Sequence, residues 1–236
     1  MGRVVRLPLH VIPSGTRVPI LRGRLKGKKW IVGSGTHGCW LGIYERTKAE
    51  AFGDKLQRGS VVFDIGAHVG FYTLLASQCV GPQGKVFAFE PLPANLRFLN
   101  EHLRLNRVSN VSVIEAAVSD AGGVACFEEG RTTSTGRLSE RGRVRVATVS
   151  LDDMVSSGQI SPPDFMKIDV EGAEGRVLRG GKTVISSARP VIFLATHNEA
   201  VHRECCDLLR TLGYGLCSLD ARPVGESEEL LATWNV

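Results

Sequence analysis

A run of apolar residues that ends in an acid and a glycine-rich turn sets the first limit on the fold of this chain. Residues 61–77 read VVFDIGAHVGFYTLLAS: the apolar run leads into Asp64, Gly66 and Gly70 lie four positions apart, and an apolar helical pattern follows. Glycine at such a turn lets the backbone change direction tightly and lets a ligand lie against it. The segment therefore predicts a strand, a tight turn and a helix, an arrangement typical of nucleotide-type cofactor sites.

The spacing of these glycines does not favour a dinucleotide. A dinucleotide-binding turn has the pattern Gly-x-Gly-x-x-Gly, whereas here His68 stands midway between the two glycines. The Asp64 carboxylate would repel a pyrophosphate but attract an ammonium or sulfonium group. We therefore expect Asp64, Gly66, His68 and Gly70 to form a loop beside a cationic cofactor, with a structural turn that holds no ligand as the alternative.

Strands and helices alternate along the rest of the chain. We expect strands at 60–65, 85–90, 111–115, 164–169, 190–196, 214–219 and 228–235, and helices at 71–79, 93–105, 151–156, 173–179, 182–187 and 199–212. Two further strands, 124–127 and 143–149, flank a polar loop at 129–142. This alternation predicts an α/β fold, a mostly parallel sheet with helices on both faces.

Ligands of such sheets bind outside the carboxyl ends of the strands. The segments to inspect are therefore those that follow strands, namely 64–70, 90–91, 115–117, 169–174 and 196–198.

The N-terminal segment differs from the rest in charge. Residues 1–44 hold eight basic residues and no acid, and the remaining residues carry 21 basic and 24 acidic residues. Residues 17–33 predict a β-hairpin and 43–56 a helix. We expect 1–56 to form a basic hairpin-and-helix appendage and 57–236 to form the main domain. The basic hairpin is either a solvated surface or a contact for an anionic partner.

Several classes of protein are not indicated. No apolar run approaches the roughly 20 residues of a membrane helix, and the N-terminus lacks the apolar segment of a secretory signal. The six cysteines show no metal-binding spacing, which predicts reduced thiols and a cytoplasmic protein with no membrane partner. The sequence does not indicate an oligomeric state.

A carboxylate ends the next predicted strand. Glu90, followed by Pro91, lies 20 residues beyond Gly70 in KVFAFEP. A carboxylate at this position can accept hydrogen bonds from both hydroxyls of a ribose. An exposed acid at a strand end is the alternative, but the preceding Asp64 turn favours ribose binding.

Three acids crowd the end of the predicted strand 164–169. In KIDVEGAE, Asp169, Glu171 and Glu174 fall within six residues. Such crowding is costly unless a positive group lies nearby or the acids are well solvated. Glu174 has a further explanation, because an acid at a helix N-terminus interacts favourably with the helix dipole.

With these segments in order, the chain resembles the FkbM-type family of S-adenosylmethionine-dependent (class I) methyltransferases. The resemblance covers about residues 60–195 and rests on FDIGAHVGFYTLLAS, KVFAFEPLPANLRFLNEHLRLN, NVSVIEAAVSD and PPDFMKIDVEGAEGRVLRGG. It implies a Rossmann-like sheet of seven strands, one of them antiparallel. It also implies O-methylation of a small-molecule hydroxyl acceptor, such as a sugar or a glycosylated metabolite, with S-adenosyl-L-methionine as methyl donor.

The resemblance also implies roles for individual residues. Asp64, Gly66 and Gly70 would surround the methionine part of the cofactor, and Glu90 with Pro91 would lie at the ribose. Glu115, Ala116 and Ala117 would flank the adenine, and Asp169 would lie near the sulfonium. His68 stands where the family often has a small polar residue, so its role beside the cofactor stays open.

The sequence suggests a catalytic group at Asp169, Glu171 and His197. An acceptor hydroxyl must be aligned with the S–CH3 bond and must lose its proton. His197 follows the predicted strand 190–196 and is our candidate base or supporting partner; a histidine that merely precedes a helix capped by Asn198 is the alternative. His202, one helical turn further on, is expected on the surface. The same three residues suit Mg²⁺, but nothing in the sequence supports a required metal, and we assign no metal ligand.

The loop 129–142 and the hairpin 17–33 are our candidates for acceptor binding.

Two other functions stay open. An RNA methyltransferase of the tRNA-modifying type is the nearest alternative, but the net acidity of the main domain does not favour a nucleic-acid partner. A non-catalytic module that binds S-adenosylmethionine is the other.

Overall fold

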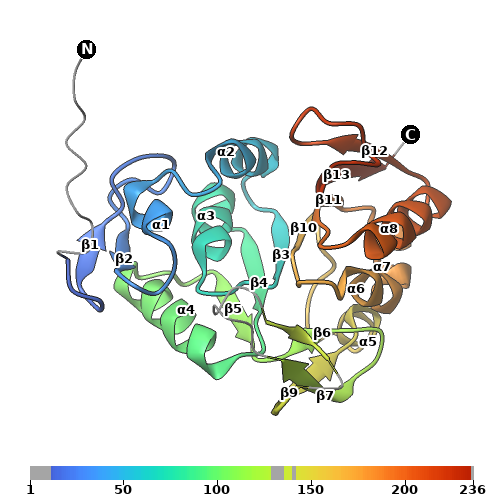
Figure 1. Ribbon diagram of the computed structural model, residues 1–236, viewed down its shortest axis with the longest axis horizontal. Helices are drawn as coiled ribbons and strands as arrows, with labels where there is room; N and C mark the ends of the chain where they lie inside the picture. The colour runs from blue at the N-terminus through green and yellow to red at the C-terminus, as the bar shows by residue number, and fades with distance from the viewer. Residues whose placement is uncertain (1–11, 129–135, 140–141, 235–236) are drawn as a thin grey trace.

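The computed structural model describes residues 12–128, 136–139 and 142–234 and has a seven-stranded sheet at its centre (Figure 1). Its strands are β3 (Val61–Ile65), β4 (Lys85–Phe89), β5 (Val111–Ile114), β10 (Phe165–Ile168), β11 (Val191–Ala195), β12 (Tyr214–Ser218) and β13 (Glu229–Trp234). Their order is β12-β13-β11-β10-β3-β4-β5, and β13 runs antiparallel to both of its neighbours while the strands from β11 to β5 pair in parallel. This confirms the expected α/β fold with one antiparallel strand.

Helices cover both faces of this sheet (Figure 1). They are α3 (Phe71–Val80), α4 (Pro93–Leu105), α5 (Leu151–Ser156), α6 (Glu174–Gly180), α7 (Lys182–Ala188) and α8 (Glu199–Thr211). Neighbouring residues of a strand point to opposite faces: Val62 packs in the core under α3 and α4, and Phe63 packs in the core under α5 to α8. Because both faces are buried, the strands read as continuous apolar runs, which is why the sequence pattern located them.

The predicted helix starts are confirmed at two capping residues. The Ser150 hydroxyl accepts the backbone N–H of Asp153 at 3.3 Å, and the Asn198 side chain accepts the N–H of Val201 at 2.9 Å. Each satisfies one of the N–H groups that a helix start leaves without an intrahelical partner.

The N-terminal segment packs against the same core as α3 and α4. It contains the short hairpin of β1 (Arg17–Pro19) and β2 (Lys29–Ile31), then α1 (His37–Leu41) and α2 (Arg46–Lys55). The hairpin was expected; α1 was not, and the second helix begins three residues later than predicted. Trp30 and Phe52 are fully buried in this core. The boundary at residue 56 stays a prediction.

His102 of α4 connects the hairpin to the loop after β3. Its Nε2 accepts the backbone N–H of Ile31 at 3.1 Å, and its Nδ1 donates to the carbonyl of Val69 at 2.8 Å. The imidazole also stacks on Trp30 with ring centroids 3.9 Å apart. The loop expected to hold a cofactor is therefore tied to the N-terminal segment through one side chain.

A second, four-stranded sheet lies beyond β5. It comprises β6 (Ala117–Val118), β7 (Gly123–Glu128), β8 (Arg137–Leu138) and β9 (Val144–Val149), in the order β6-β9-β7-β8. The two strands expected around the polar loop are confirmed as β7 and β9. Most of that loop, 129–135 and 140–141, lies outside the described residues.

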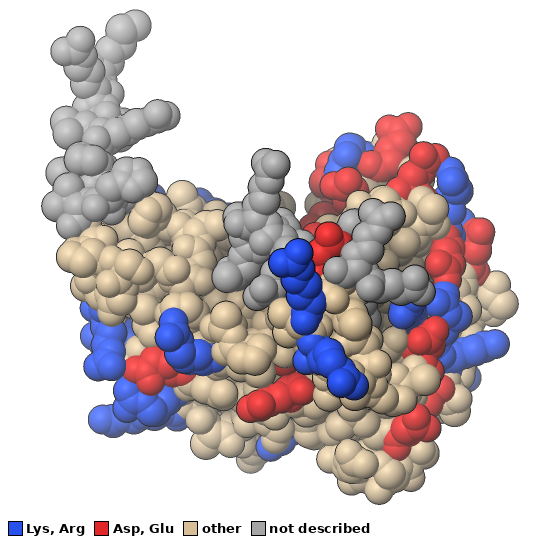
Figure 2. Space-filling view, turned by 60° about the horizontal axis from the view of Figure 1, so that its bottom comes forward, with Lys and Arg blue, Asp and Glu red and all other residues tan. Residues whose placement is uncertain are grey.

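The outer surface of the described residues carries no long apolar helix and an uneven charge. None of the helices described is long and apolar enough to cross a bilayer. On the face in Figure 2, Lys and Arg side chains gather on the side of β1, β2 and α4, and Asp and Glu side chains gather at the upper right. Part of the basic charge is paired, since Arg17 lies 3.0 Å from Glu101 and Arg24 pairs with Asp54.

Candidate active site

A cavity of about 570 Å³ opens at the carboxyl ends of β3, β4, β10 and β11. The predicted site residues that line it are Gly66, His68, Glu90, Pro91, Ala116, Ala117, Asp169, Glu171 and His197. Asp64, Gly70 and Glu115 are not in its wall: Asp64 is fully buried behind the loop, and Glu115 is exposed outside. The strand ends thus bring together residues more than 100 positions apart in the sequence.

The shape of the loop after β3 is fixed by its two glycines. Gly66 has a φ of +81°, and a Cβ there would lie 1.9 Å from the carbonyl oxygen of Asp169. Gly70 has a φ of +92°, and its Cβ would lie 2.5 Å from Leu99 Cδ1. Both positions therefore require glycine for the packing of the chain itself.

Glu90 holds the same loop from the opposite side. Its carboxylate accepts the backbone N–H of His68 at 2.8 Å, the N–H of Leu92 at 2.9 Å and the side-chain NH2 of Asn95 at 3.1 Å. Only 4% of Glu90 is exposed, so the alternative of an exposed strand-end acid is wrong. Burial raises the pKa of Glu90, and these three donors partly offset that rise.

His68 is the residue of this loop with the least common backbone. Its φ is +51°, in the left-handed region that non-glycine residues seldom adopt. Burial lowers the pKa of His68 to about 4, and the charge of Lys167 acts in the same direction. The imidazole is therefore neutral at pH 7.

A buried lysine connects two of the predicted acids. Lys167 Nζ donates to the Gly66 carbonyl at 3.1 Å and lies 3.4 Å from Asp169 Oδ2 and 3.7 Å from Asp64 Oδ1. Asp64 also accepts the Thr73 hydroxyl at 2.6 Å. Burial alone would lower the pKa of Lys167, but the two carboxylates outweigh it and the pKa is raised. Asp64 thus supports the cavity floor from behind.

A second lysine reaches the cavity from α2. Lys48 Nζ lies 2.7 Å from Glu229 Oε1, 3.6 Å from Glu45 Oε2 and 3.9 Å from Asp169 Oδ2. The Tyr72 hydroxyl donates to Glu45 Oε2 at 2.7 Å. Burial would raise the pKa of Asp169, but Lys167, Lys48 and His197 together lower it to about 2. Asp169 is therefore ionised at every physiological pH.

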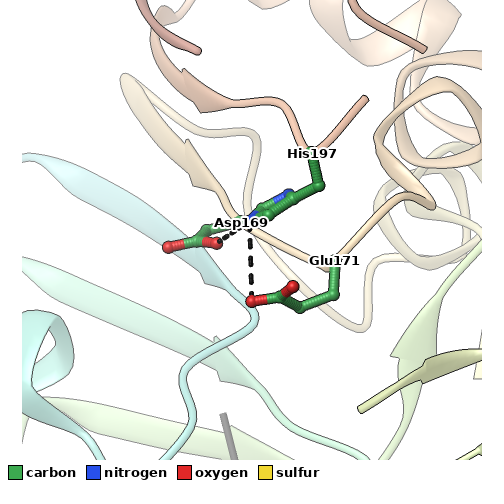
Figure 3. Close-up of side chains that lie close together, drawn as sticks. All are labelled: Asp169, Glu171 and His197. Carbon is green, nitrogen blue, oxygen red and sulfur yellow. Dashed lines mark ion pairs between the residues drawn. The ribbon is translucent and has the colours of Figure 1, made fainter. Parts of the chain in front are cut away.

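His197 lies among three carboxylates, Asp169, Glu171 and Glu174, which together with it we name the acid–histidine cluster. Its Nδ1 is 2.7 Å from Glu174 Oε1, and its Nε2 is 3.5 Å from both Asp169 Oδ1 and Glu171 Oε1. Figure 3 shows Asp169 and Glu171, which follow β10, facing His197, which follows β11. The three residues expected to be catalytic are thus adjacent, although their roles stay predictions.

The charges around His197 hold its proton. Burial would lower the pKa of His197, but the hydrogen bond to Glu174 and the charges of the three carboxylates raise it to about 9. The imidazole is consequently cationic at pH 7 in this structure, so it accepts a proton only in the small fraction that has lost its own.

The expectation for His202 is wrong. Only 7% of this residue is exposed, and its Nδ1 lies 3.0 Å from the Thr196 hydroxyl. Its Nε2 lies 3.5 Å from Cys206 Sγ. His202 belongs to the buried face of α8 because its polar atoms find partners there.

Sequence reasoning missed several charged and polar wall residues: Glu45, Lys48, Tyr72, Lys167 and Glu229. Lys167 carried a usable signal, because it is the only charged residue in the otherwise apolar strand β10, and lysine is almost never fully buried without a partner. The others lie on α2 or at its N-cap, on α3 and on β13, and had no such signal.

Comparison with known proteins gives a consistent picture at the level of the family. The model of the Methyltransferase FkbM domain matches residues 64–216. The hexuronic acid methyltransferase AglP of Haloferax volcanii is 29% identical over 141 residues, which cover 59% of this chain and 57% of the relative. The 31-O-demethyl-FK506 methyltransferase FkbM of Streptomyces tacrolimicus is 30% identical over 162 residues, covering 54% of this chain and 62% of the relative. The chain thus matches less than two thirds of the length of either relative.

Solved structures agree on the fold. The crystal structure of methyltransferase FkbM from Methylobacillus flagellatus has a TM-score of 0.52 and 17% identity, over 85% of this chain and 56% of that one. A precorrin-6y C5,15-methyltransferase from Geobacter metallireducens also has a TM-score of 0.52, with 19% identity over 81% of this chain and 88% of that one.

The family match covers more than half of the sequence and includes the loop after β3, Glu90 and the acid–histidine cluster. The expected resemblance is confirmed, and with it the cofactor of the family, S-adenosylmethionine. The chain belongs to the FkbM domain family of methyltransferases.

Proposed function

We propose that this protein is an S-adenosylmethionine-dependent O-methyltransferase that acts on a hydroxyl of a sugar or natural product. The observation that carries the proposal is the cavity, because its wall joins the Glu90 side of the loop after β3 to the acid–histidine cluster. One end suits a nucleoside, and the other offers groups that can orient a hydroxyl and take its proton.

The wall residues fit the cofactor in shape and charge. Ala116, Ala117, Leu92 and Phe127 form an apolar surface for an adenine beside Glu90. Five carboxylates and two lysines line the cavity among the described residues, a balance that favours a cationic ligand. When bound there, S-adenosylmethionine supplies a methyl group on a positively charged sulfur.

Glu90 has a double task in this proposal. Its Oε1 accepts from Leu92 and Asn95, and its Oε2 accepts from His68. A carboxylate offers about four acceptor sites, so capacity remains for a ribose hydroxyl. Glu90 would therefore orient the ribose while it fixes the loop that bounds the methionine part.

The acid–histidine cluster acts at the acceptor end. Asp169, held ionised by the two lysines, stabilises positive charge beside the reacting methyl group. With S-adenosylmethionine bound, the acceptor oxygen would gain the methyl group as the carbon–sulfur bond breaks, and the cluster residues would supply the alignment on which much of the rate depends. Glu171 or the neutral form of His197 receives the hydroxyl proton.

The names of relatives indicate the class of acceptor. AglP is named for a hexuronic acid, and NoeI of Sinorhizobium fredii, 27% identical over 149 residues that cover 55% of this chain and 60% of the relative, is named a 2-O-methyltransferase. The Streptomyces relative is named for the 31-O position of FK506. These names support a hydroxylated small molecule as acceptor; the hairpin 17–33 and loop 129–142 stay our candidates for contacting it.

A screen of acceptors tests the proposal. Purified protein is incubated with S-adenosylmethionine and a panel of uronic acids, neutral sugars, hydroxylated macrolides and transfer RNA, and the products are analysed by mass spectrometry. We expect methylation of a sugar or macrolide hydroxyl, lost in Asp169→Ala and His197→Ala and retained in Glu199→Gln, an exposed acid at the start of α8. Methylation of RNA alone, or cofactor binding with no methylated product, would reject the proposal.

A further inference from the structure

We propose that Asp169, Glu171 and His197 form a binding site for a divalent cation, Mn²⁺ or Mg²⁺, at the acceptor end of the cavity. Each residue offers one ligand atom, and these atoms all lie within 4.8 Å of one another. His197 Nε2 is 3.5 Å from an oxygen of each acid (Figure 3). Ligands about 2.1 Å from one ion lie about 3 to 4 Å apart, so the cluster needs only small side-chain movements to enclose it.

An independent observation concerns the orientation of His197. Glu174 is fully buried, and its Oε1 holds His197 Nδ1 at 2.7 Å. Metal-binding histidines commonly donate their second ring N–H to a carboxylate in this way, which fixes the tautomer and directs the other nitrogen to the ion. Here the other nitrogen, Nε2, faces Asp169 and Glu171. Glu174 Oε1 also accepts the backbone N–H of Gly172 at 2.9 Å, which fixes the carboxylate beside the ring, and Glu174 Oε2 is buried without a hydrogen-bond partner among the described residues.

The two oxygens of Asp169 face different charges. Oδ2 lies 3.4 Å from Lys167 and 3.9 Å from Lys48, and Oδ1 lies on the side of His197. The lysines therefore neutralise the charge near Oδ2, and Oδ1 stays available as a ligand atom on the side of His197. Lys48 also pairs with Glu45 and Glu229, so its positive charge does not cancel the negative charge of Glu171 and Glu174.

The donor set indicates the kind of ion. Two carboxylate oxygens suit Mg²⁺ and Mn²⁺, and an imidazole nitrogen favours Mn²⁺ over Mg²⁺. Three protein ligands leave about half of an octahedral ion open to water or to an acceptor hydroxyl. On the proposed function, which this step requires, the ion would hold the hydroxyl beside the methyl group and lower its pKa, and the free oxygen of Glu171, not the metal-bound His197, would receive the proton. The binding site itself does not depend on that function.

Metal binding is measured without cofactor or acceptor. Chelator-treated protein is titrated with Mn²⁺, and free Mn²⁺ is followed by electron paramagnetic resonance. We expect one saturable site, weakened about tenfold or more in Glu171→Gln and in His197→Gln. Glu199→Gln, which makes the same change of charge outside the cluster, serves as the control and should bind like the wild type. The side chain of Glu171 is 31% exposed, so its variant should stay folded, which thermal unfolding verifies.

The outcomes separate this inference from the proposed function. No saturable binding up to about 1 mM, or equal binding by wild type and both variants, would overturn the metal site. Methyl transfer that persists in chelator would leave the proposed function intact without it. A bound ion with no methylated product would support the site and reject the function.

Discussion

Two histidines, the buried His102 and the partly exposed His197, show how differently the two regions beside this cavity are built. His102 stacks on Trp30 and exchanges hydrogen bonds with Ile31 and Val69, so both ring nitrogens meet backbone groups. His197 meets three carboxylates instead. Burial lowers the pKa of His102 despite small opposing effects, whereas the carboxylates raise the pKa of His197 to about 9 although burial opposes it.

The difference indicates what each region does. The surroundings of His102 require a neutral ring, because Nε2 must accept the N–H of Ile31. That region holds the hairpin against the loop after β3. The surroundings of His197 concentrate negative charge at the carboxyl ends of β10 and β11. Such a concentration of charge can bind a cation or take part in a reaction. Variants on the first side should therefore change stability, and variants on the second should change activity.

The largest expected effect is on activity at the second side. His197→Ala should lower kcat/KM for the acceptor by about 10²- to 10⁴-fold, the range that a positioned proton acceptor contributes. Its unfolding temperature should fall by less than that of Trp30→Ala, because the side chain of His197 is 29% exposed. Steady-state kinetics and thermal unfolding measure the two quantities. An equal loss of activity in Glu199→Gln would show that the effect is not specific to the cluster.

Trp30→Ala should give the largest loss of stability. Trp30 is fully buried and stacks on His102, and truncating such an aromatic residue costs about 3–5 kcal/mol. Chemical denaturation measures the free energy of unfolding, and Trp30→Phe, which keeps an aromatic ring, is the matched control. If Trp30 affects stability and not catalysis, the folded fraction of Trp30→Ala keeps most of its activity. A loss of activity as deep as that of His197→Ala would contradict this distinction between the two regions.

The pH dependence of stability distinguishes the two histidines further. The folded pKa of His102 lies below its ordinary value of 6.5. The unfolded chain therefore takes up a proton more readily than the native one as the pH falls below 6.5. The contribution of a neutral His102 is complete above that pH and is lost below it, by at most about 1.4 kcal/mol per pH unit.

Denaturation of the wild type and His102→Gln between pH 7 and 5 measures this contribution. The glutamine can still accept the N–H of Ile31 but does not titrate. We expect the variant to lose less stability than the wild type over this interval. Parallel curves would mean that other groups account for the acid sensitivity.

The sheet and the strand-end residues could be predicted because their signals are local. Buried parallel strands read as apolar runs, and parallel strands place their carboxyl ends at one edge. Glu90, Asp169 and His197 therefore fell into one cavity although they are far apart in the sequence. The tight turn at Gly66 was predicted from its position after β3 in the same way.

The part of the site that comes from α2 could not be predicted. Lys48 and Glu45 enter the cavity because Phe52 packs edge-on against Tyr72 and Phe193, at centroid distances of 5.3 and 5.0 Å. That contact joins residues distant in sequence, and no periodicity within 43–56 encodes it. The exposure of His202 was predicted wrongly because its partner Thr196 lies outside α8, in the segment after β11.

The smallest expected effect is a shift in the pKa of His197 when Glu174 is neutralised. Glu174→Gln keeps the size of the side chain but removes the charge that lies closest to the ring. A hydrogen bond to a charged group contributes about 1.5–3 kcal/mol, so the pKa should fall from about 9 by about one unit or more. Histidine proton resonances followed across pH by nuclear magnetic resonance measure the midpoint, with Glu199→Gln as control.

This shift also has a consequence for stability. Because the folded pKa of His197 is raised, its charged form stabilises the native state fully below 6.5, and the stabilisation is lost as the pH rises through about 9. In Glu174→Gln the loss should still begin near pH 6.5 but should be complete at a lower pH than in the wild type, while the acid-side behaviour set by His102 stays as in the wild type. A midpoint that does not move would mean that Asp169 and Glu171 hold the proton by themselves. Glu174 would then stabilise only the start of α6, and the raised pKa of His197 would be due to Asp169 and Glu171 alone.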